Sequence, residues 1–382
     1  MTAAHGAGAA RLGRRALLVL AATSLTAASA GPRTEVPAVM TPLPARPAAP
    51  RPAVKLKPVA HWAEVFEQSW DYSDRVGRPA SRSGDSWDHY ELSYSVDAAI
   101  AMFRATGDTR YLDRALEYVE NVVGAARPSS TLPRSQFRDA YRGWASMRDS
   151  LDRPGDEIPL YESYFWRYGT ALLVAMRENP VAARYRDRYQ RLLRFAEVDV
   201  FEKWYSRGPA DHIYRNRTHM ASHWALIALH LSLVTADPAR RARYRQVGDT
   251  IDARLRGQLR RNPVAPTAYF WSDVWGSARR PGQDVSHANG VMAYVVEARD
   301  RGQRWTAADM SGFAALLTDV IWPGGRTYRA YVDGTGSDNG WFADGFVKLG
   351  RFDPAVQRRL EDHEVVNDQF AANMALNARV LA

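Results

Sequence analysis

Two kinds of helix alternate along the chain beyond residue 60, and this alternation limits the possible folds more than any other feature of the sequence. Apolar residues recur there at the i, i+3, i+4 spacing of helices, and strand-like alternation is scarce. One kind is amphipathic with a charged outer face, and its examples are 108–123, 184–200, 238–259 and 306–322. The other kind is apolar or aromatic nearly all round, and its examples are 90–108, 161–179, 218–237, 286–302, 339–353 and 366–382. Helices that are polar on one side cover a surface, whereas helices that are apolar all round are enclosed.

Most of the enclosed helices are followed by a covering helix, which is typical of a helical-hairpin repeat. Several enclosed helices end in similar short turns, with the sequences ATGD, TAD and LGRFD. We therefore predict an all-α fold of the (α/α)6 type, a toroid of helical hairpins with about six inner and six outer helices. An open α-solenoid is the alternative, but the terminal repeats lack the polar capping face that an open array requires, and this favours a closed ring.

Two N-terminal segments precede the predicted toroid. Residues 1–30 combine a basic start, an apolar run too short to span a bilayer and small residues at Ala28–Ala30, which predicts a cleaved signal peptide. Residues 31–58 are rich in Pro and Ala without a periodic apolar face, so we expect an extended linker. The catalytic domain is then 59–382, and the mature protein is expected to be secreted, extracellular and not membrane-bound.

The amino-acid composition excludes several kinds of active site and indicates the charge of the partner. The chain has no cysteine, which excludes a cysteine nucleophile, an iron–sulfur cluster and a thiolate zinc site. Its net charge of +9 favours an anionic partner such as an acidic polysaccharide. No nucleic-acid recognition motif is present, so nucleic acid is not an expected partner. No cofactor is predicted, and the sequence indicates no oligomeric state.

In a toroid the inner helices run in the same direction, so the segments that precede them share one rim. These segments are dense in Asp, Glu, His, Asn, Tyr and Trp, and they span 84–91, 156–164, 211–223, 281–290, 334–341 and 361–368. A polar and aromatic rim suits a glycan, because rings stack on sugar faces while amides and carboxylates bind hydroxyls. Some of these residues, Asp284 among them, can also be ordinary N-caps.

Histidines at two neighbouring rim segments are not explained by helix capping. His219 and His223 are four residues apart on one helical face, which is compatible with a metal pair. The segment HMASH lacks the glutamate of the metalloprotease motif, so we predict no metal. Helix N-termini together with Arg217 favour carboxylate or sulfate groups at this rim.

Two segments resemble those of a known group of enzymes. YRNRTHMASHWALIALHLSLVT is similar to the Asn/His-led inner helix of the alginate-lyase-like polysaccharide lyases, which are (α/α)-toroid carbohydrate-active enzymes. DVSHANGVMAYVVEA is similar to a later His-containing inner helix of the same lyases. In those lyases Asn and His are commonly adjacent, whereas here Arg217 and Thr218 separate Asn216 from His219.

The resemblance implies cleavage of a uronic-acid-containing polysaccharide by β-elimination. Asn216, Arg217 and His219 would neutralise the substrate carboxylate, which lowers the pKa of the proton to be removed. A tyrosine or histidine would act as base or acid, and the available residues are Tyr164, Tyr214, Tyr328, Tyr331 and His287. Substrate-binding positions would be Trp87, Asp88, Tyr90, Trp271, Asp284, Asn289 and Trp341.

Three alternatives remain open. A glycoside hydrolase on the same toroid would use an acid and a base carboxylate, roughly 6.5–9.5 Å apart when it inverts configuration. The carboxylates at the rim that could serve are Asp88, Glu91, Glu162, Asp284, Asp338 and Asp368. A uronyl C5-epimerase would share the proton-abstraction step. The last alternative, of a different class, is a non-catalytic glycan-binding protein of the cell envelope.

Overall fold

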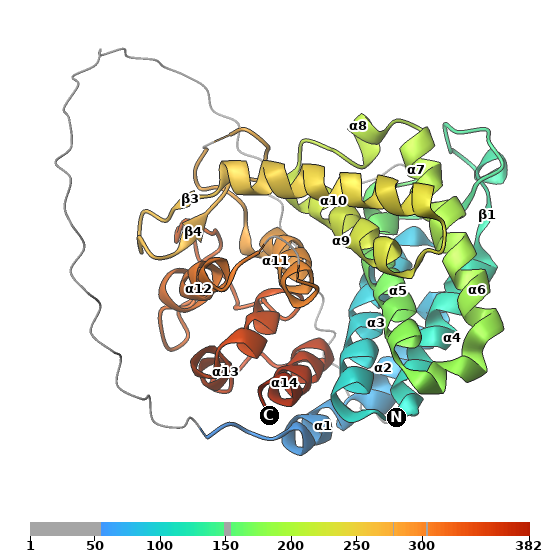
Figure 1. Ribbon diagram of the computed structural model, residues 1–382. Helices are drawn as coiled ribbons and strands as arrows, with labels where there is room; N and C mark the ends of the chain where they lie inside the picture. The colour runs from blue at the N-terminus through green and yellow to red at the C-terminus, as the bar shows by residue number, and fades with distance from the viewer. Residues whose placement is uncertain (1–54, 149–153, 278, 303–304) are drawn as a thin grey trace, which may run out of the picture. The chain divides into compact units, whose positions relative to one another are not determined.

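Six inner elements follow one another round a closed ring (Figure 1). The computed structural model describes residues 55–148, 154–277, 279–302 and 305–382. In ring order the inner elements are α3 (Ser86–Thr106), α5 (Pro159–Glu178), α9 (Thr218–Val234), α11 (Val285–Asp300), η5 (Phe346–Phe352) and α14 (Asp368–Leu381). The last of them, α14, packs against α3 and so closes the ring. The predicted all-α (α/α)6 toroid is confirmed, and the open solenoid is excluded.

Outer elements cover this ring. They are α1 (Val59–Glu67), α2 (Trp70–Arg82), α4 (Thr109–Ala125), α6 (Arg186–Phe195), η3 (Ala196–Glu202), α7 (Lys203–Ser206), α10 (Pro238–Gln258), α12 (Ala307–Ala315), η4 (Leu316–Ile321) and α13 (Pro354–Leu360). Outer helices pack on the inner helix before them in several hairpins, as α4 does on α3 and α10 on α9, whereas α12 packs on η5. Both η3 and η4 are π-helical turns that extend the preceding α-helix.

The remaining elements are short. They comprise η1 (Ser129–Thr131), η2 (Pro180–Tyr185), α8 (Pro209–His212) and two antiparallel pairs, β1 (Arg127–Pro128) with β2 (Arg142–Gly143) and β3 (Arg260–Arg261) with β4 (Tyr269–Phe270).

The predicted turns between inner and outer helices end in capping aspartates. Asp108, Asp237 and Asp353 each accept a hydrogen bond from a backbone N–H in the first turn of α4, α10 and α13, respectively. Such a cap stabilises a helix by about 1 kcal/mol because it satisfies an otherwise unpaired N–H group. The turns ATGD, TAD and LGRFD therefore start the outer helices.

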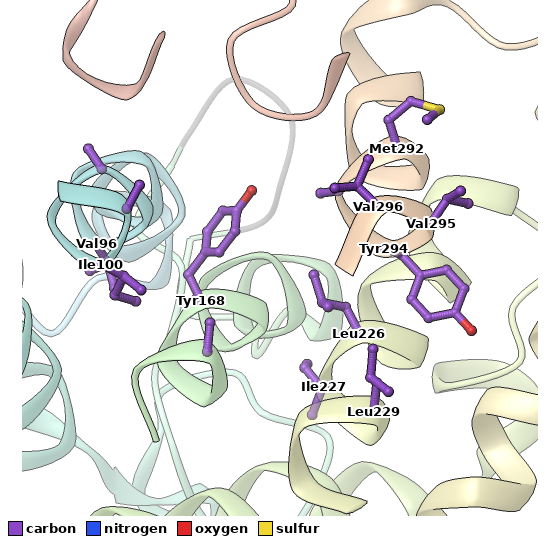
Figure 2. Close-up of a cluster of buried hydrophobic side chains, with 14 of the residues drawn as sticks. Val96, Ile100, Tyr168, Leu226, Ile227, Leu229, Met292, Tyr294, Val295 and Val296 are labelled. Atoms are coloured by element: carbon purple, nitrogen blue, oxygen red, sulfur yellow. The ribbon is translucent and has the colours of Figure 1, made fainter. Parts of the chain in front are cut away.

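The inner helices pack their apolar faces against one another. Figure 2 shows Val96 and Ile100 of α3, Tyr168 of α5, Leu226 of α9 and Val296 of α11 within one buried cluster. Burying a side chain of this size stabilises the fold by about 1.5–3 kcal/mol. The inner helices are apolar nearly all round because both their flanks and their outer sides are covered.

The fifth inner element departs from the prediction of a helix over 339–353. Only Phe346–Phe352 is helical, and it is a 3₁₀-helix. A Cβ on Gly345 would lie 2.1 Å from the backbone oxygen of Asn289, so the chain here passes directly against α11. Gly340 has a φ of 76°, which a helix does not allow. The segment before η5 is consequently a loop, and it carries Trp341 and Asp344 to the start of α11.

Among the described residues no helix combines the length and the apolarity needed to cross a bilayer. The predicted signal peptide, and the predicted linker up to residue 54, lie outside the described residues.

Candidate active site

A pocket with about 390 Å³ of empty volume, part of it open to solvent, lies where the inner helices begin. It is lined by Tyr90, Tyr94, Tyr164, His219, His223, Ser286, His287, Asn289, Trp341 and Asp344, and we call it the histidine–tyrosine cleft. All of these residues lie in the first turns of α3, α5, α9 and α11 or in the loop before η5. The cleft brings together six of the residues that were singled out in the sequence: His219, His287, Tyr164, Tyr90, Asn289 and Trp341.

The histidine side of the cleft comes from α9 and α11. The ring centroid of His219 lies 4.3 Å from that of His287 and 6.0 Å from that of His223. Both ring nitrogens of His219 are buried and have no hydrogen-bond partner among the described residues. The Nδ1 of His287 lies 2.7 Å from the carboxylate of Asp284. This contact fixes the proton of a neutral His287 on Nδ1 and leaves Nε2 for another partner.

Asp284 is also the N-cap of α11. Its carboxylate accepts a hydrogen bond from the backbone N–H of His287 at 3.0 Å and another from Ser286 Oγ at 2.5 Å. The capping interpretation and a functional role are therefore compatible, because the same carboxylate fixes the helix start and the histidine ring.

Burial and nearby charges move the two histidine pKa values in opposite directions. Burial lowers the pKa of His219 well below its usual value, and the neighbouring His287 lowers it further. Burial also acts to lower the pKa of His287, but the hydrogen bond to Asp284 and its charge outweigh burial and raise that pKa above its usual value. Near neutral pH His219 is therefore uncharged, and His287 is the more easily protonated of the two.

An aromatic column forms the opposite side of the cleft. The rings of Trp87 and Tyr90 stack at 4.8 Å, and those of Tyr90 and Tyr164 stack at 3.8 Å. The guanidinium of Arg148 lies 3.6 Å from the Trp87 ring centroid, and that of Arg167 lies 3.8 Å from the Tyr164 ring centroid. Because neighbours cover the ring faces, the column presents ring edges and hydroxyls to the cleft. A sugar therefore has no open ring face of Trp87 or Tyr90 on which to stack.

A buried carboxylate lies at the base of the tyrosines. Asp344 accepts hydrogen bonds from Arg167 Nη2 at 2.7 Å, Tyr168 OH at 2.5 Å, Gln369 Nε2 at 2.9 Å and Tyr164 OH at 3.2 Å. Burial acts to raise the pKa of Asp344, but nearby positive charges, chiefly Arg167, outweigh it and hold this pKa below its usual value. Asp344 is thus an ionised acceptor whose bonds are used within the fold.

Asn289 lines the cleft, but its amide group is used to hold the neighbouring loop. Its Nδ2 donates to the backbone oxygen of Trp341 at 3.0 Å, and its Oδ1 accepts from the backbone N–H groups of Gly345 and Phe346. In the structure Asn289 therefore holds the loop that carries Trp341 and Asp344, whereas the sequence suggested that Asn289 contacts the substrate directly.

Seven other site residues selected from the sequence are not among those lining the cleft: Trp87, Asp88, Tyr214, Asn216, Arg217, Trp271 and Asp284. Trp271 is completely buried and packs edge-on against Phe313, so it offers no surface to a sugar. The segment before α9 is held by the loop that follows β4, through an ion pair between Arg217 and Asp273. The neutralising role expected for Asn216 and Arg217 therefore has no support from their position.

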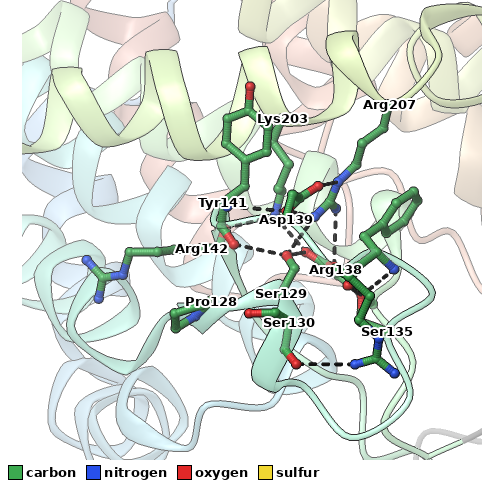
Figure 3. A network of polar contacts seen from close by, with 12 residues as sticks. Pro128, Ser129, Ser130, Ser135, Arg138, Asp139, Tyr141, Arg142, Lys203 and Arg207 are labelled. Carbon is green, nitrogen blue, oxygen red and sulfur yellow. Dashed lines mark hydrogen bonds and ion pairs between the residues drawn. The ribbon is translucent and has the colours of Figure 1, made fainter.

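Glu162, a candidate hydrolase carboxylate, is buried and contacts Lys203. Lys203 belongs to a polar network that Figure 3 shows together with Arg207 and Ser129. Lys203 Nζ contacts Glu162 at 2.7 Å and Glu157 at 3.0 Å, and Arg207 Nη1 contacts Glu157 at 3.1 Å. Burial raises the pKa of Glu162 to about 7. This network fastens the loop after α4 to α5 and α7, and a substrate has no access to Glu162.

Asp338 and Asp284 form a different carboxylate pair at the rim. Burial raises the pKa of Asp338, and the negative charge of Asp284 raises it further. Burial acts to raise the pKa of Asp284 too, but hydrogen bonds from His287 and Ser286 hold it far below its usual value. The environment thus moves the pKa values of the two carboxylates in opposite directions. Neither is among the residues that line the cleft.

Sequence reasoning selected neither Tyr94 nor Asp344, and it considered His223 only as a metal ligand. Tyr94 could have been found, because it follows Tyr90 by four residues and therefore shares its face of α3. Asp344 gave no such signal, because the segment before η5 was expected to be helical. Within the described residues no group of three His, Asp or Glu side chains is arranged to ligate one metal ion, so His219 and His223 gather no third ligand there.

Comparison with known proteins gives a distant match in fold. No family model and no curated protein matches the sequence. Two solved structures of inactive variants of the alpha-1,6-mannanase GH76A of Salegentibacter sp. HEL1_6 are similar to this chain. They were solved in complex with alpha-1,6-mannotetrose and alpha-1,6-mannotriose, with TM-scores of 0.47 and 0.48, 11% sequence identity, and coverage of 84% of this chain and 99% of theirs. Neither is a lyase, so the comparisons give no support to the lyase family, and similarity this distant carries no information about substrate or catalytic residues.

Proposed function

We propose that the chain is a carbohydrate-active enzyme that cleaves a uronic-acid-containing polysaccharide by β-elimination in the histidine–tyrosine cleft. The observation that carries this proposal is the pairing of His219, a buried neutral base, with His287, a histidine whose pKa is raised by Asp284. Elimination requires a base for the proton next to the carboxylate, a cation for the charge that develops there, and an acid for the leaving oxygen.

His219 would act as the base. Its low pKa keeps the ring neutral, and neither ring nitrogen is engaged by another described residue. A ring nitrogen can therefore take the proton from the sugar carbon next to the carboxylate. The weak basicity of a buried histidine is compensated when the substrate carboxylate enters the cleft, because a nearby negative charge raises the pKa of an imidazole.

His287 would neutralise the substrate carboxylate. Asp284 stabilises the protonated form of His287, and only the protonated imidazole carries the positive charge that binds a carboxylate. This assignment replaces the one made for Asn216 and Arg217, because those two residues lie outside the cleft lining. The positive charge stabilises the enolate-like state in which the carboxylate gains electron density.

Tyr90 would protonate the leaving oxygen. Burial raises the pKa of Tyr90, so its hydroxyl is protonated at neutral pH and available as an acid. It lines the cleft together with His219 and His287. The proton removed by His219 and the proton given by Tyr90 balance, and exchange with solvent restores both groups after the product leaves.

Hydrolysis is the second candidate, and the separated pKa values of Asp284 and Asp338 favour it. Asp338 would be the acid and Asp284 the base on this interpretation. We prefer elimination because Asp284 and Asp338 are outside the cleft lining, while the carboxylate that does line the cleft, Asp344, is bonded to Arg167.

The test is incubation of the mature protein with a panel of polyuronides and neutral polysaccharides, α-mannan included. Elimination produces an unsaturated uronic product, which absorbs in the ultraviolet, in step with new chain ends. New reducing ends without that absorbance would instead establish hydrolysis, and inversion at the carboxylate-bearing carbon without chain cleavage would establish epimerisation. Binding without any product would favour the non-catalytic alternative. We also propose that the protein is secreted, on the sequence pattern of residues 1–30.

A further inference from the structure

His223 lines the histidine–tyrosine cleft, but the proposed reaction does not use its imidazole. The residue is 1% exposed, and its Nδ1 is buried without a hydrogen-bond partner among the described residues. No hydrogen bond links its Nε2 to another described residue either. The ring contacts its surroundings by packing: it meets the Tyr164 ring edge-on at 4.9 Å, and Gly290 leaves room for it against α11.

An unbonded imidazole is unusual in a protein interior, where most buried polar groups have a partner. His363, which is 5% exposed and does not line the cleft, shows the usual arrangement. Its Nδ1 lies 3.2 Å from Tyr328 OH, and its Nε2 lies 3.0 Å from the backbone oxygen of Gly340. A buried donor or acceptor without a partner lowers stability. A ligand in the cleft could supply the partner that His223 lacks within the described chain.

The protonation state of His223 limits the group that it can bind. Burial and the positive charge of Arg167 hold the pKa of His223 well below its usual value, so the ring is neutral near neutral pH. A neutral imidazole has one N–H donor and one acceptor nitrogen, which match a hydroxyl group. It lacks the positive charge that binds a carboxylate, and the proposed reaction assigns that role to His287.

His223 is also close to the proposed base. His219 and His223 are one helical turn apart on α9, and their ring centroids are 6.0 Å apart. This separation is comparable with the width of one sugar ring. We propose that His223 determines specificity by hydrogen bonding to a hydroxyl of the sugar from which His219 removes a proton. The inference rests on the proposed function for its ligand class, a uronic acid.

Calorimetry with D-glucuronate and its monodeoxy analogues tests the recognition of each hydroxyl in turn. The wild-type protein should bind one analogue about five- to tenfold more weakly than glucuronate, because that analogue lacks the hydroxyl bound by His223. His223→Leu should bind this analogue and glucuronate with equal affinity. His61→Leu is the control, since His61 lies on α1 and outside the cleft lining, and it should discriminate as the wild type does.

Unfolding in urea tests whether the fold leaves His223 without a partner. His223→Leu removes nitrogens that have no partner, so its midpoint should be at least as high as that of the wild type. His363→Leu removes two hydrogen bonds and leaves Tyr328 and Gly340 without them, so its midpoint should fall. A fall in His223→Leu as large as that in His363→Leu would overturn the inference, because it would show that His223 is bonded within the protein.

Three binding results would also overturn it: equal affinity of the wild-type protein for all analogues, unchanged discrimination by His223→Leu, or no binding of glucuronate. If His223→Leu does not fold, His223→Met takes its place, because the flexible Met side chain adapts to irregular spaces and has no N–H donor. Binding needs no turnover. The expected discrimination without any unsaturated product would therefore overturn β-elimination and leave the role of His223 standing.

Discussion

Burial fixes the charge of the side chains from which the cleft is built. His219 and His223 lose water, and their pKa values fall well below the usual value for that reason first. His287 is the exception, because Asp284 supplies a charge and a hydrogen bond that more than offset burial. Three histidines in one pocket thus differ in how easily they are protonated, His287 more easily than His219 and His223. The chemistry depends on this difference, and single substitutions can remove it.

Replacing His219 with Ala should lower kcat by at least about a hundredfold, which is the usual contribution of a general base. The substitution should leave the circular-dichroism spectrum unchanged, because the imidazole makes no hydrogen bond to another described residue. Turnover of the preferred polysaccharide, followed in the ultraviolet, measures the effect. His61→Ala, at a helix far from the cleft in sequence and outside its lining, is the control, and a similar loss there would contradict the assignment.

The pH dependence of the reaction should have an alkaline limb set by His287. This histidine must be protonated to bind the carboxylate, and its raised pKa extends activity to higher pH than an unperturbed histidine would allow. Asp284→Asn keeps an N-cap but removes the charge that raises this pKa, so the alkaline limb should move to lower pH. A profile of kcat/KM against pH in both proteins measures the shift; an unchanged limb in Asp284→Asn would refute the role of the pair.

His89 should make the fold sensitive to acid. Burial lowers its pKa to about 3, so the folded protein keeps it neutral while the unfolded chain binds a proton near the usual histidine pKa of about 6.5. The unfolded state therefore binds more protons below that pH, and stability falls as pH drops from about 6.5 toward 3, by about 1.4 kcal/mol per pH unit. His89→Phe should unfold in urea with a smaller dependence on pH in that range. A dependence equal to that of wild type would show that other groups cause the acid sensitivity.

Among the elements, the loop before η5 departs most from the helix expected there, and it contributes two residues to the cleft. It replaces the start of the expected fifth inner helix, and it places Trp341 and Asp344 beside α11. Asn289 fixes this loop with its whole amide group. The arrangement works only because the chain at Gly345 approaches α11 without a side chain between them.

Gly345→Ala should therefore disturb both stability and activity. The added Cβ would lie 2.1 Å from the backbone oxygen of Asn289, and backbone cannot move aside cheaply. We expect a loss of about 2–4 kcal/mol in the free energy of unfolding, as for other substitutions that overpack a core, together with a reduced kcat. Gly248→Ala, in the middle of α10 with open space around the new Cβ, should instead stabilise by about 0.5–1 kcal/mol. Urea unfolding of both variants gives the comparison, and equal effects would contradict the close approach.

The extent to which the sequence predicted this structure differs between elements. The five long inner helices were predictable because their all-round apolar pattern reflects burial on every side. The fifth inner element was not, since its sequence FADGF looks apolar as a helix does, and only the contact of Gly345 with α11 explains its loop. At the cleft, His219 and His287 could be selected by type and position. Asp344 could not, because its place in the cleft depends on contacts between residues far apart in the chain, such as that with Tyr164.

On the scale of the whole molecule, buried ion pairs inside the ring connect hairpins that are far apart in the sequence. Arg167 of α5 and Asp344 before η5 are 177 residues apart and form an ion pair of 2.7 Å with almost no exposure of either side chain. Lys348 and Asp97 form a second pair, between η5 and α3. A 3₁₀-helix has poorer hydrogen-bond geometry than an α-helix, and these two ion pairs help to hold η5 and the loop before it in the ring. The same carboxylate, Asp344, orients the tyrosines of the cleft, which couples ring closure to the site.

A double-mutant cycle on Arg167 and Asp344 tests this coupling. Removing one partner leaves the other charge buried without compensation, so Arg167→Met and Asp344→Asn should each cost about 3–5 kcal/mol in the free energy of unfolding. The double variant leaves no buried charge at this position, and it should lose less than the sum of the two by about 1–3 kcal/mol. Unfolding in guanidinium chloride, followed by tryptophan fluorescence, measures all four proteins. The double variant should be more stable than additivity predicts but should not regain activity, because Tyr164 would have no carboxylate as its hydrogen-bond acceptor. Strictly additive losses of stability would show that Arg167 and Asp344 do not act as a unit.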